Sequence, residues 1–332
     1  MEVAIAFNLK KKEEDKPPDY FSEYDKKSTV LAIASALRSK GHKVDLIEVN
    51  SKDLIEEFSK RKVDIIFNIS EGNGTAYRES EVPAILDLLG IPYTGSSPFT
   101  LALTLDKAMT KRIFRGEGIP TPNFQVFKRP NTPLDPNLKF PLIVKPNREG
   151  SAKGINVSCV VREKKELYRK IEGIFKSYRQ EVLVEEFIEG KELTVGILEN
   201  GSISVLPILE IDFSTCREDI ERFYSWRMKE YQGNKELGLT PTFFCPARIP
   251  KKIEEKIKLF SLKAHLALGC KGLSRIDLRL SRGNIPYFLE VNPLPGLDPE
   301  ESNFPMMAKA AGIDYADLIE IILNSSLEKR CN

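Results

Sequence analysis

Histidine is scarce in this chain of 332 residues, which contains only His42 and His265. So few histidines argue against a histidine-ligated metal site and against a serine–histidine–aspartate triad. His42 follows a glycine between an expected helix and an expected strand, so we expect it at the surface. His265 lies in a helical pattern and is expected to be packed.

The five cysteines are odd in number and none form a CxxC pair. They are Cys159, Cys216, Cys245, Cys270 and Cys331. This pattern argues against a disulfide framework or a structural zinc site, and it favours a reducing environment. The apolar run from Met1 to Phe7 is too short for a signal peptide, and no stretch approaches the length of a membrane span. We therefore expect a cytoplasmic protein with no membrane partner.

The chain also lacks an excess of either charge, with 50 Lys and Arg residues against 48 Asp and Glu residues. This balance gives no reason to expect a nucleic-acid partner. The phosphate-binding pattern GxxxxGK followed by Ser or Thr is missing, and Gly72-Asn73-Gly74 lacks the third glycine of a dinucleotide-binding fingerprint. A Walker-type NTPase and a Rossmann dehydrogenase are therefore disfavoured.

The first part of the chain alternates strand and helix patterns, which is typical of a parallel sheet covered on both faces. Strands are expected at 3–7, 43–49 and 63–69, and helices at 28–40, 54–61 and 79–89. Further strands are expected at 140–144, 155–161, 182–187, 193–198, 203–211, 273–280 and 286–291, with helices at 163–178 and 253–268. We predict an α/β domain over residues 1–104, followed by two α+β domains over 105–190 and 191–332. The long polar segment 212–239 is expected to be a functional loop.

Near the C-terminus, a predicted hairpin presents two carboxylates on one face. A two-residue turn at Gly283-Asn284 would place Asp277 opposite Glu290 and Arg275 opposite Asn292. Facing carboxylates repel each other unless a cation lies between them, and an Asp, Glu and Asn set suits a hard cation such as Mg²⁺. A solvated hairpin with a charged outer face remains the alternative, and a bulge would change the pairing.

The segment from Lys145 to Gly154 joins two expected strands and contains two glycines, which let a backbone approach a ligand closely. Its backbone N–H groups, Ser151 and Lys153 could donate hydrogen bonds to phosphate oxygens. A plain hairpin tip without a ligand is the alternative.

Several segments, in order, resemble the D-alanine–D-alanine ligase family from about residue 80 to the C-terminus, about three quarters of the chain. They are Ile91–Ser96, Leu105–Lys107, Ile143–Pro146, Arg148–Gly154, Val184–Gly190, Glu192–Val195, Phe244–Ala247, Gly269–Gly272, Arg275–Asp277, Leu289–Asn292 and Pro295–Gly296. Each motif is modest alone, but the ordered set is specific. The resemblance implies an ATP-grasp fold whose two later domains sandwich ATP. It also implies an ATP-dependent carboxylate–amine ligase that forms a dipeptide-type amide through an acyl phosphate.

The resemblance further implies a role for each matching residue. ATP would be bound by Lys107, Lys145, Gly150, Ser151, Glu185, Glu186, Phe187, Ile188, Glu192 and Lys229. Asp277, Glu290 and Asn292 would hold two Mg²⁺ ions, or Mn²⁺ in their place. Arg275 and the backbone N–H of Gly296 would stabilise the tetrahedral intermediate, Ser151 would order the first substrate, and Lys229 would reach the γ-phosphate. A homodimer is also implied.

The substrate side departs from the family pattern. The N-terminal turn with a glutamate that binds the first substrate's ammonium has no match, and Glu13, Glu14 and Glu23 are candidate replacements. A Lys-Tyr pair of the family is here Lys229-Glu230, so the tyrosine is missing unless Tyr231 replaces it. Glu230, Tyr231 and Ser302 are the candidate substrate-binding residues, and Ser302 is expected to meet the second substrate's carboxylate.

Three hypotheses therefore stay open. The first is a D-alanine–D-alanine ligase that supplies a cell-wall dipeptide. The second is an ATP-grasp ligase for another amino acid or peptide, because a changed pocket can change specificity by orders of magnitude. The third is a nucleotide-binding regulator without turnover. The set of Asp277, Glu290, Asn292 and Arg275 argues against the third.

Overall fold

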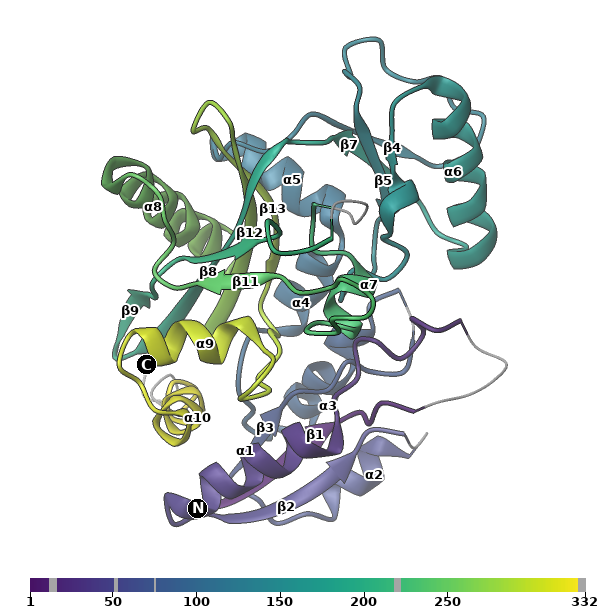
Figure 1. Ribbon diagram of the computed structural model, residues 1–332. Coiled ribbons are helices and arrows are strands. Elements are labelled where there is room, and N and C mark those ends of the chain that lie inside the picture. Colours follow the sequence, from purple (N-terminus) through teal and green to yellow (C-terminus); the bar gives the residue numbers. More distant parts are fainter. Residues whose placement is uncertain (12–16, 51–52, 75, 218–221, 328–332) are drawn as a thin grey trace.

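The computed structural model describes residues 1–11, 17–50, 53–74, 76–217 and 222–327, which fold around three sheets that follow the chain order (Figure 1). The first sheet consists of the parallel strands β1 (Glu2–Phe7), β2 (Lys43–Glu48) and β3 (Ile65–Asn68), with β1 in the centre. Its helices are α1 (Lys27–Ser39), α2 (Leu54–Ser59) and α3 (Glu81–Leu89). Alternate residues of β1 enter two separate cores, Val3 and Ile5 with α1, and Ala4 with α2 and α3. The predicted parallel sheet with two covered faces is confirmed.

The second sheet has the order β4-β7-β5-β6 and is covered by α6 (Lys164–Tyr178). Its strands are β4 (Phe124–Phe127), β5 (Leu142–Pro146), β6 (Val160–Val161) and β7 (Val182–Glu186). The strand predicted at 155–161 is mostly wrong, because Val157–Cys159 forms a short 3-10 helix, η2. The side chain of Asn156 accepts a hydrogen bond from the Ser158 N–H, a local bond that competes with strand pairing.

The third sheet has the order β11-β10-β8-β12-β13, with β9 paired to β8. Its strands are β8 (Gly190–Asn200), β9 (Ser202–Val205), β10 (Leu209–Asp212), β11 (Thr242–Phe244), β12 (Leu273–Ser281) and β13 (Pro286–Asn292). The single strand predicted at 203–211 is wrong: it is divided into β9 and β10 around Pro207, which has no N–H to give to a ladder. The helix α7 (Trp226–Glu230) interrupts the long polar segment, and the Ser225 hydroxyl caps it by accepting from the Met228 N–H.

Helices join these sheets. Between the first two lie the short 3-10 helix η1 (Arg78–Ser80), α4 (Pro98–Leu105) and α5 (Lys107–Gly116). Asp106 caps α5, since its carboxylate accepts from the Met109 N–H at 3.0 Å. The third sheet is flanked by α8 (Lys251–Ala267), α9 (Asn303–Ala310) and α10 (Tyr315–Asn324).

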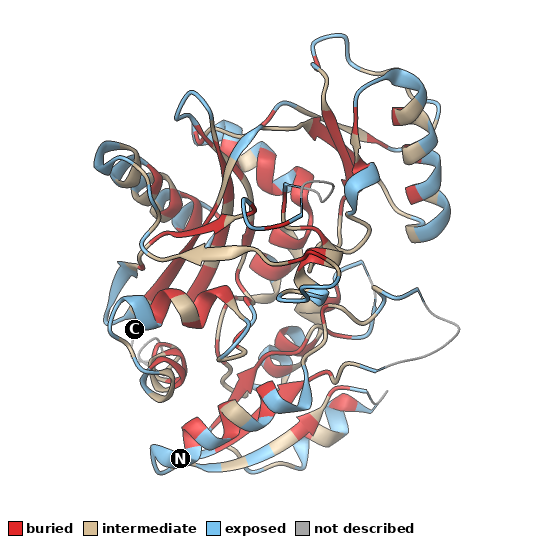
Figure 2. Ribbon diagram, in the orientation of Figure 1, coloured by how far each residue is buried: buried red, intermediate tan, exposed pale blue. Residues whose placement is uncertain are grey.

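The first and third sheets share one hydrophobic core. Helix α10 lies beside α1 (Figure 1), and Leu318 and Ile322 of α10 belong to the same buried cluster as Ile33 and Leu37 of α1. Buried residues concentrate in the central strands of the sheets (Figure 2). This shared core fixes the N-terminal sheet against the part of the chain that carries the β12–β13 hairpin.

The predictions for the two histidines have different outcomes. His265 is fully buried and its Nδ1 lies 2.7 Å from the Ser274 hydroxyl, which confirms the packed position. The surface position expected for His42 is wrong, because only 8% of its side chain is exposed. Its Nε2 lies 2.8 Å from the Glu320 carboxylate, since α10 covers the link between α1 and β2.

None of the helices in the described parts of the chain combines the length and the apolar character that crossing a membrane requires.

Candidate active site

The β12–β13 hairpin pairs the residues that the sequence predicts. Asp277 lies opposite Glu290, and Arg275 lies opposite Asn292. The predicted two-residue turn is nevertheless wrong. The Ser281 N–H donates to the Ile285 carbonyl, so the loop has one residue more, and Asn284 takes the left-handed conformation with φ of 58°.

A bulge explains why the pairing survives. Beyond Asp277 the register shifts, so that Leu278 lies opposite Phe288 and Leu289 is the extra residue. The longer turn and the bulge each displace the pairing by one residue, in opposite directions. The predicted pairs are therefore right although the predicted turn is not.

The carboxylates of the hairpin are neutralised by nearby cations, one on the same strand and one from α5. Asp277 accepts from Arg275 Nε at 3.0 Å and from the Thr194 hydroxyl at 2.6 Å, and the Asn292 amide donates to it at 3.0 Å. Glu290 lies 3.0 Å from the Lys107 ammonium at the start of α5. Burial opposes ionisation of Glu290, but the charges of Lys107 and neighbouring lysines outweigh burial and hold its pKa below the usual range.

A first cavity, here called the hinge cavity, lies where β7 leads into β8. It is lined by Lys107, Lys145, Glu185, Glu186, Phe187, Ile188, Glu192, Lys229, Arg275, Asp277 and Glu290, among others. The structure therefore brings together most of the residues to which the sequence assigns ATP. Gly150 and Ser151 are exceptions, because the hinge cavity is lined instead by Glu149 and Ala152 of the same loop.

Two further carboxylates of the hinge cavity, Glu185 and Glu192, also have cation partners. Glu185 is buried and binds both Lys145, at 2.5 Å, and Lys111, at 2.6 Å. Lys111 is fully buried, and burial and the charge of Lys145 lower its pKa to about 8 against the opposing effect of Glu185. Glu192 lies 2.6 Å from Arg279. Lys111 was not predicted from the sequence, although it lies one helical turn after Lys107 and that spacing was the available signal.

The loop predicted to cover phosphates is held by carboxylates of the N-terminal segment. The Gly150 N–H donates to Glu23 at 2.6 Å, and the Gly154 N–H donates to Asp19 at 2.9 Å. Ser151 and Ala152 have φ angles of 46° and 57°, a conformation that costs energy for residues with a side chain. The amide groups of this loop thus face oxygen ligands, as they would face phosphate oxygens.

Glu23 is the only described candidate among the three glutamates proposed for the first substrate, since Glu13 and Glu14 lie outside the described residues. Its carboxylate is buried and accepts from both Arg78 Nε, at 3.0 Å, and Arg78 Nη2. Burial alone would raise the pKa of Glu23, but the charges of Arg78 and Lys153 lower it. Glu23 is therefore already neutralised by the protein.

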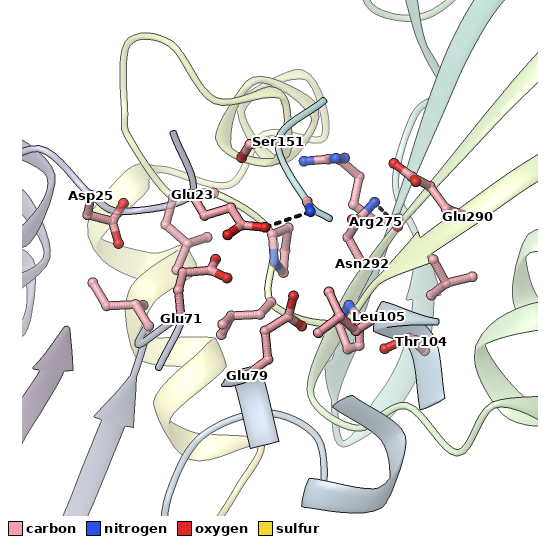
Figure 3. A pocket seen from close by; sticks show the side chains of 18 of the residues that line it. Glu23, Asp25, Glu71, Glu79, Thr104, Leu105, Ser151, Arg275, Glu290 and Asn292 are labelled. Carbon is pink, nitrogen blue, oxygen red and sulfur yellow. Dashed lines mark hydrogen bonds between the residues drawn. The ribbon is translucent and has the colours of Figure 1, made fainter. Parts of the chain in front are cut away.

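A second cavity, here called the acidic cavity, contains three further carboxylates. Asp25, Glu71 and Glu79 line it together with Glu23, Ser151, Arg275 and Gly296. Figure 3 shows the side chains of Asp25, Glu71 and Glu79 pointing toward the space between them. Within the described residues, none of the three forms an ion pair with a lysine or arginine. Burial, with the nearby Asp298, raises the pKa of Asp25 to about 7. Burial, followed by the charge of Glu23 and others, raises the pKa of Glu79 to about 7 against the opposing charge of Arg78.

These three carboxylates were not found from the sequence. Glu71 follows the end of β3, and Asp25 is bridged to Leu9 just after β1. The carboxyl ends of parallel strands are the usual place for ligands in open α/β sheets, and that rule was the available signal. Glu79 lies in η1, in a stretch to which the sequence patterns assigned no role.

A third cavity, here called the polar cavity, contains two of the three residues predicted to bind substrate. Glu230 and Ser302 line it, along with Gly296, Lys229 and Asn303. Glu230 forms an ion pair with Lys10 at 2.5 Å. Tyr231, the predicted replacement tyrosine, does not line this cavity: it is 42% exposed and packs edge-on against Trp226, which does line it. Tyr224 lines the cavity instead.

Comparisons with known proteins agree with this geometry. Residues 113–324 match the sequence model of the D-ala D-ala ligase C-terminus. A D-alanine–D-alanine ligase of Carboxydothermus hydrogenoformans is 37% identical over 309 residues, covering 90% of this chain and 92% of that protein.

Solved structures are similar over the whole chain. The D-alanine–D-alanine ligase of Bacillus anthracis in complex with ATP has a TM-score of 0.75 at 28% identity, covering 99% of this chain and 98% of that one. The VanG D-Ala:D-Ser ligase of Enterococcus faecalis has a TM-score of 0.73 at 25% identity, covering 98% and 99%. This chain therefore belongs to the D-alanine–D-alanine ligase family of the ATP-grasp fold and is an ATP-dependent ligase that forms a carbon–nitrogen bond.

Proposed function

We propose that this ligase joins the carboxylate of one amino acid to the amine of a second through an acyl phosphate made from ATP. One observation carries the proposal: Lys107, Lys229, Arg275 and Glu290 line both the hinge cavity and the acidic cavity. A nucleotide in the hinge cavity and an amino acid in the acidic cavity would thus meet at three cations. Phosphoryl transfer needs positioned positive charge at that junction.

The residues at the junction have distinct proposed roles. Lys107, Lys145 and Lys229 neutralise the phosphates, and Arg275 with the Gly296 N–H stabilises the oxygens of the tetrahedral intermediate. Glu185 to Ile188 hold the adenine, and Glu192 holds the ribose. Ser151, on the acidic-cavity side of the loop, orders the carboxylate substrate. These roles depend on charge and position rather than on proton transfer. Among the described residues, no histidine lines any of the three cavities, which agrees with such roles.

The hairpin has a donor set that fits magnesium. Asp277, Glu290 and Asn292 offer oxygen ligands from two paired strands, and the structure neutralises this negative charge with Arg275 and Lys107. The negative charge of Asp277 and Glu290 would suit a divalent cation as well. The bound Mg²⁺ would screen the phosphates and polarise the transferred group.

The three unpaired carboxylates of the acidic cavity favour a substrate that carries ammonium. Because Glu23 is neutralised by Arg78, the ammonium of the first amino acid would be bound by Asp25, Glu71 or Glu79. D-alanine, the substrate in the names of the relatives, brings one ammonium to three carboxylates. A diamino acid brings two cationic groups, so the acidic cavity favours it as the alternative carboxylate substrate.

Release of phosphate from ATP in the presence of Mg²⁺ tests the proposal when each product is identified by mass. D-alanine, D-serine, alkyl amino acids and diamino acids of either hand are tested as the carboxylate and as the amine partner. Amide formation with D-alanine would identify a cell-wall dipeptide ligase, and amide formation with a diamino acid alone would support the alternative substrate. ATP binding with no phosphate release for any pair would contradict the proposal. The homodimer stays a prediction, which sedimentation would test.

A further inference from the structure

Asn303 carries a buried polar group without a partner. It is the first residue of α9 and follows Ser302, and it is 8% exposed. Among the described residues, no group donates a hydrogen bond to its Oδ1 atom, which is shielded from solvent. An unsatisfied buried acceptor costs about 1–3 kcal/mol, so such groups are rare unless a ligand completes them.

Asn303 also lies where two of the cavities meet. Only Tyr224, Lys229, Arg275 and Asn303 line both the hinge cavity and the polar cavity within the described residues. These four residues therefore mark the passage from the proposed nucleotide site to the cavity that holds Ser302. An amine that approaches the nucleotide site from the polar cavity passes these residues.

The other three residues of the passage are poorer acceptors than Asn303. Lys229 and Arg275 are donors only, and their charges repel an ammonium. The Tyr224 hydroxyl donates to the Gln232 side chain at 2.6 Å, and the phenol oxygen that could still accept is a weaker acceptor than an amide carbonyl. Asn303 alone offers a carbonyl oxygen, and a carbonyl oxygen accepts from an amine without fixing it as a cation.

We propose that Asn303 is a positioning residue, whose Oδ1 accepts a hydrogen bond from the attacking amine of the second substrate. The inference rests on the proposed ligase function and adds to it the group that orients the nucleophile. Phosphates and carboxylates need donors at this point, whereas the amine is the reactant that brings N–H groups. The amine is thereby the ligand that fits the unpartnered acceptor.

The chemical step balances without a further reactant. The second substrate arrives as an ammonium and loses one proton to water in the polar cavity. Its nitrogen lone pair then forms the bond to the acyl carbon, and the carbon–oxygen bond to phosphate breaks with its electron pair on the phosphate. The second proton leaves with the phosphate. Asn303 takes part in none of these transfers and only holds the nitrogen.

The test separates activation of the carboxylate from attack by the amine. Hydroxylamine is small enough to trap an acyl phosphate as a hydroxamate without a binding pocket of its own. Asn303→Leu keeps the branching and the number of side-chain heavy atoms but removes the acceptor, and Asn303→Asp keeps an acceptor. Each variant is assayed for hydroxamate formation and for amide formation with the amine substrate, alongside Asn324→Leu on α10 as a control.

We expect Asn303→Leu to lower kcat/KM for the amine by about tenfold to a hundredfold, the loss that one hydrogen bond in a closed site brings. Hydroxamate formation should stay within about twofold of the wild type, a smaller change than one hydrogen bond brings. Asn303→Asp should recover part of the amine activity. An equal fall in both assays would mean a structural role and would overturn the inference, as would unchanged amide formation. Hydroxamate absent from the wild type would overturn the proposed function, and the inference would fall with it.

Discussion

The Lys107 ammonium lies 3.0 Å from the Glu290 carboxylate and donates to the Glu149 carbonyl at 2.7 Å. Lys107 begins α5, Glu290 lies on β13, and Glu149 belongs to the loop that follows β5. One buried lysine thus connects the proposed metal hairpin to the loop proposed to cover phosphates. Any change at Glu290 should therefore affect both metal and nucleotide.

Replacing Glu290 with Gln should raise the Mg²⁺ concentration needed for half-maximal activity by about tenfold or more, because an uncharged amide is a poorer ligand for a hard cation. A Mg²⁺ titration of phosphate release measures the effect. Glu254→Gln on the surface of α8 is the matched control. An unchanged Mg²⁺ requirement would remove Glu290 from the proposed metal site.

Arg275→Ala should lower turnover by about a hundredfold or more while leaving nucleotide affinity within about tenfold, because the arginine acts mainly on charge that develops during the reaction. Calorimetry with ATP and a phosphate-release assay separate the two effects. Arg282→Ala, at the exposed tip of the same hairpin, is the control. Full turnover in Arg275→Ala would contradict the role given to this side chain.

The ion pair between Arg78 and Glu23 should matter for stability as well as for the site. Arg78→Met leaves the buried Glu23 carboxylate with only the more distant Lys153 as a cation partner and should reduce the free energy of unfolding by about 3–5 kcal/mol. Adding Glu23→Gln removes that charge and should restore most of the loss. Urea denaturation of the wild type and of the single and double variants measures this. Equal losses in the single and double variants would show that the buried charge is not the cause.

Asp25 should make stability depend on pH. Its pKa in the folded protein is raised to about 7, so the folded state binds the proton more tightly than the unfolded chain does. Its contribution is complete at low pH and is lost as the pH rises through about 7. The stability of Asp25→Asn relative to the wild type should therefore increase by about 2 kcal/mol between about pH 5 and pH 8. A difference that stays constant over this range would contradict a protonated Asp25.

The sequence predicted which residues face each other in the β12–β13 hairpin, but it did not predict which residues line the acidic cavity. The difference has a physical reason. Arg275, Asp277, Glu290 and Asn292 lie on two strands joined by a short turn, so local pairing rules suffice to bring them together. The turn length was wrong, and only the compensating bulge at Leu289 kept the pairs correct.

The acidic cavity depends on contacts between distant segments. Asp25 ends a long connection after β1, Glu71 follows β3 and Glu79 belongs to η1. Only the rule that ligands bind at the carboxyl ends of parallel strands points to Asp25 and Glu71, and no local pattern points to Glu79. Local hydrogen bonds also decided the strand predicted at 155–161, where the side chain of Asn156 favours a 3-10 turn. Predictions based on periodicity fail where such side-chain bonds or long-range packing determine the conformation.

Identification of the product shows most directly whether this protein joins two amino acids at the expense of ATP. The protein is incubated with ATP, Mg²⁺ and paired amino acids, and phosphate and amide are measured in the same sample. The proposed function predicts one phosphate released for each amide formed, with no amide when either amino acid is omitted. Tight ATP binding with no carboxylate-dependent phosphate release, for any amino acid tested, would contradict it.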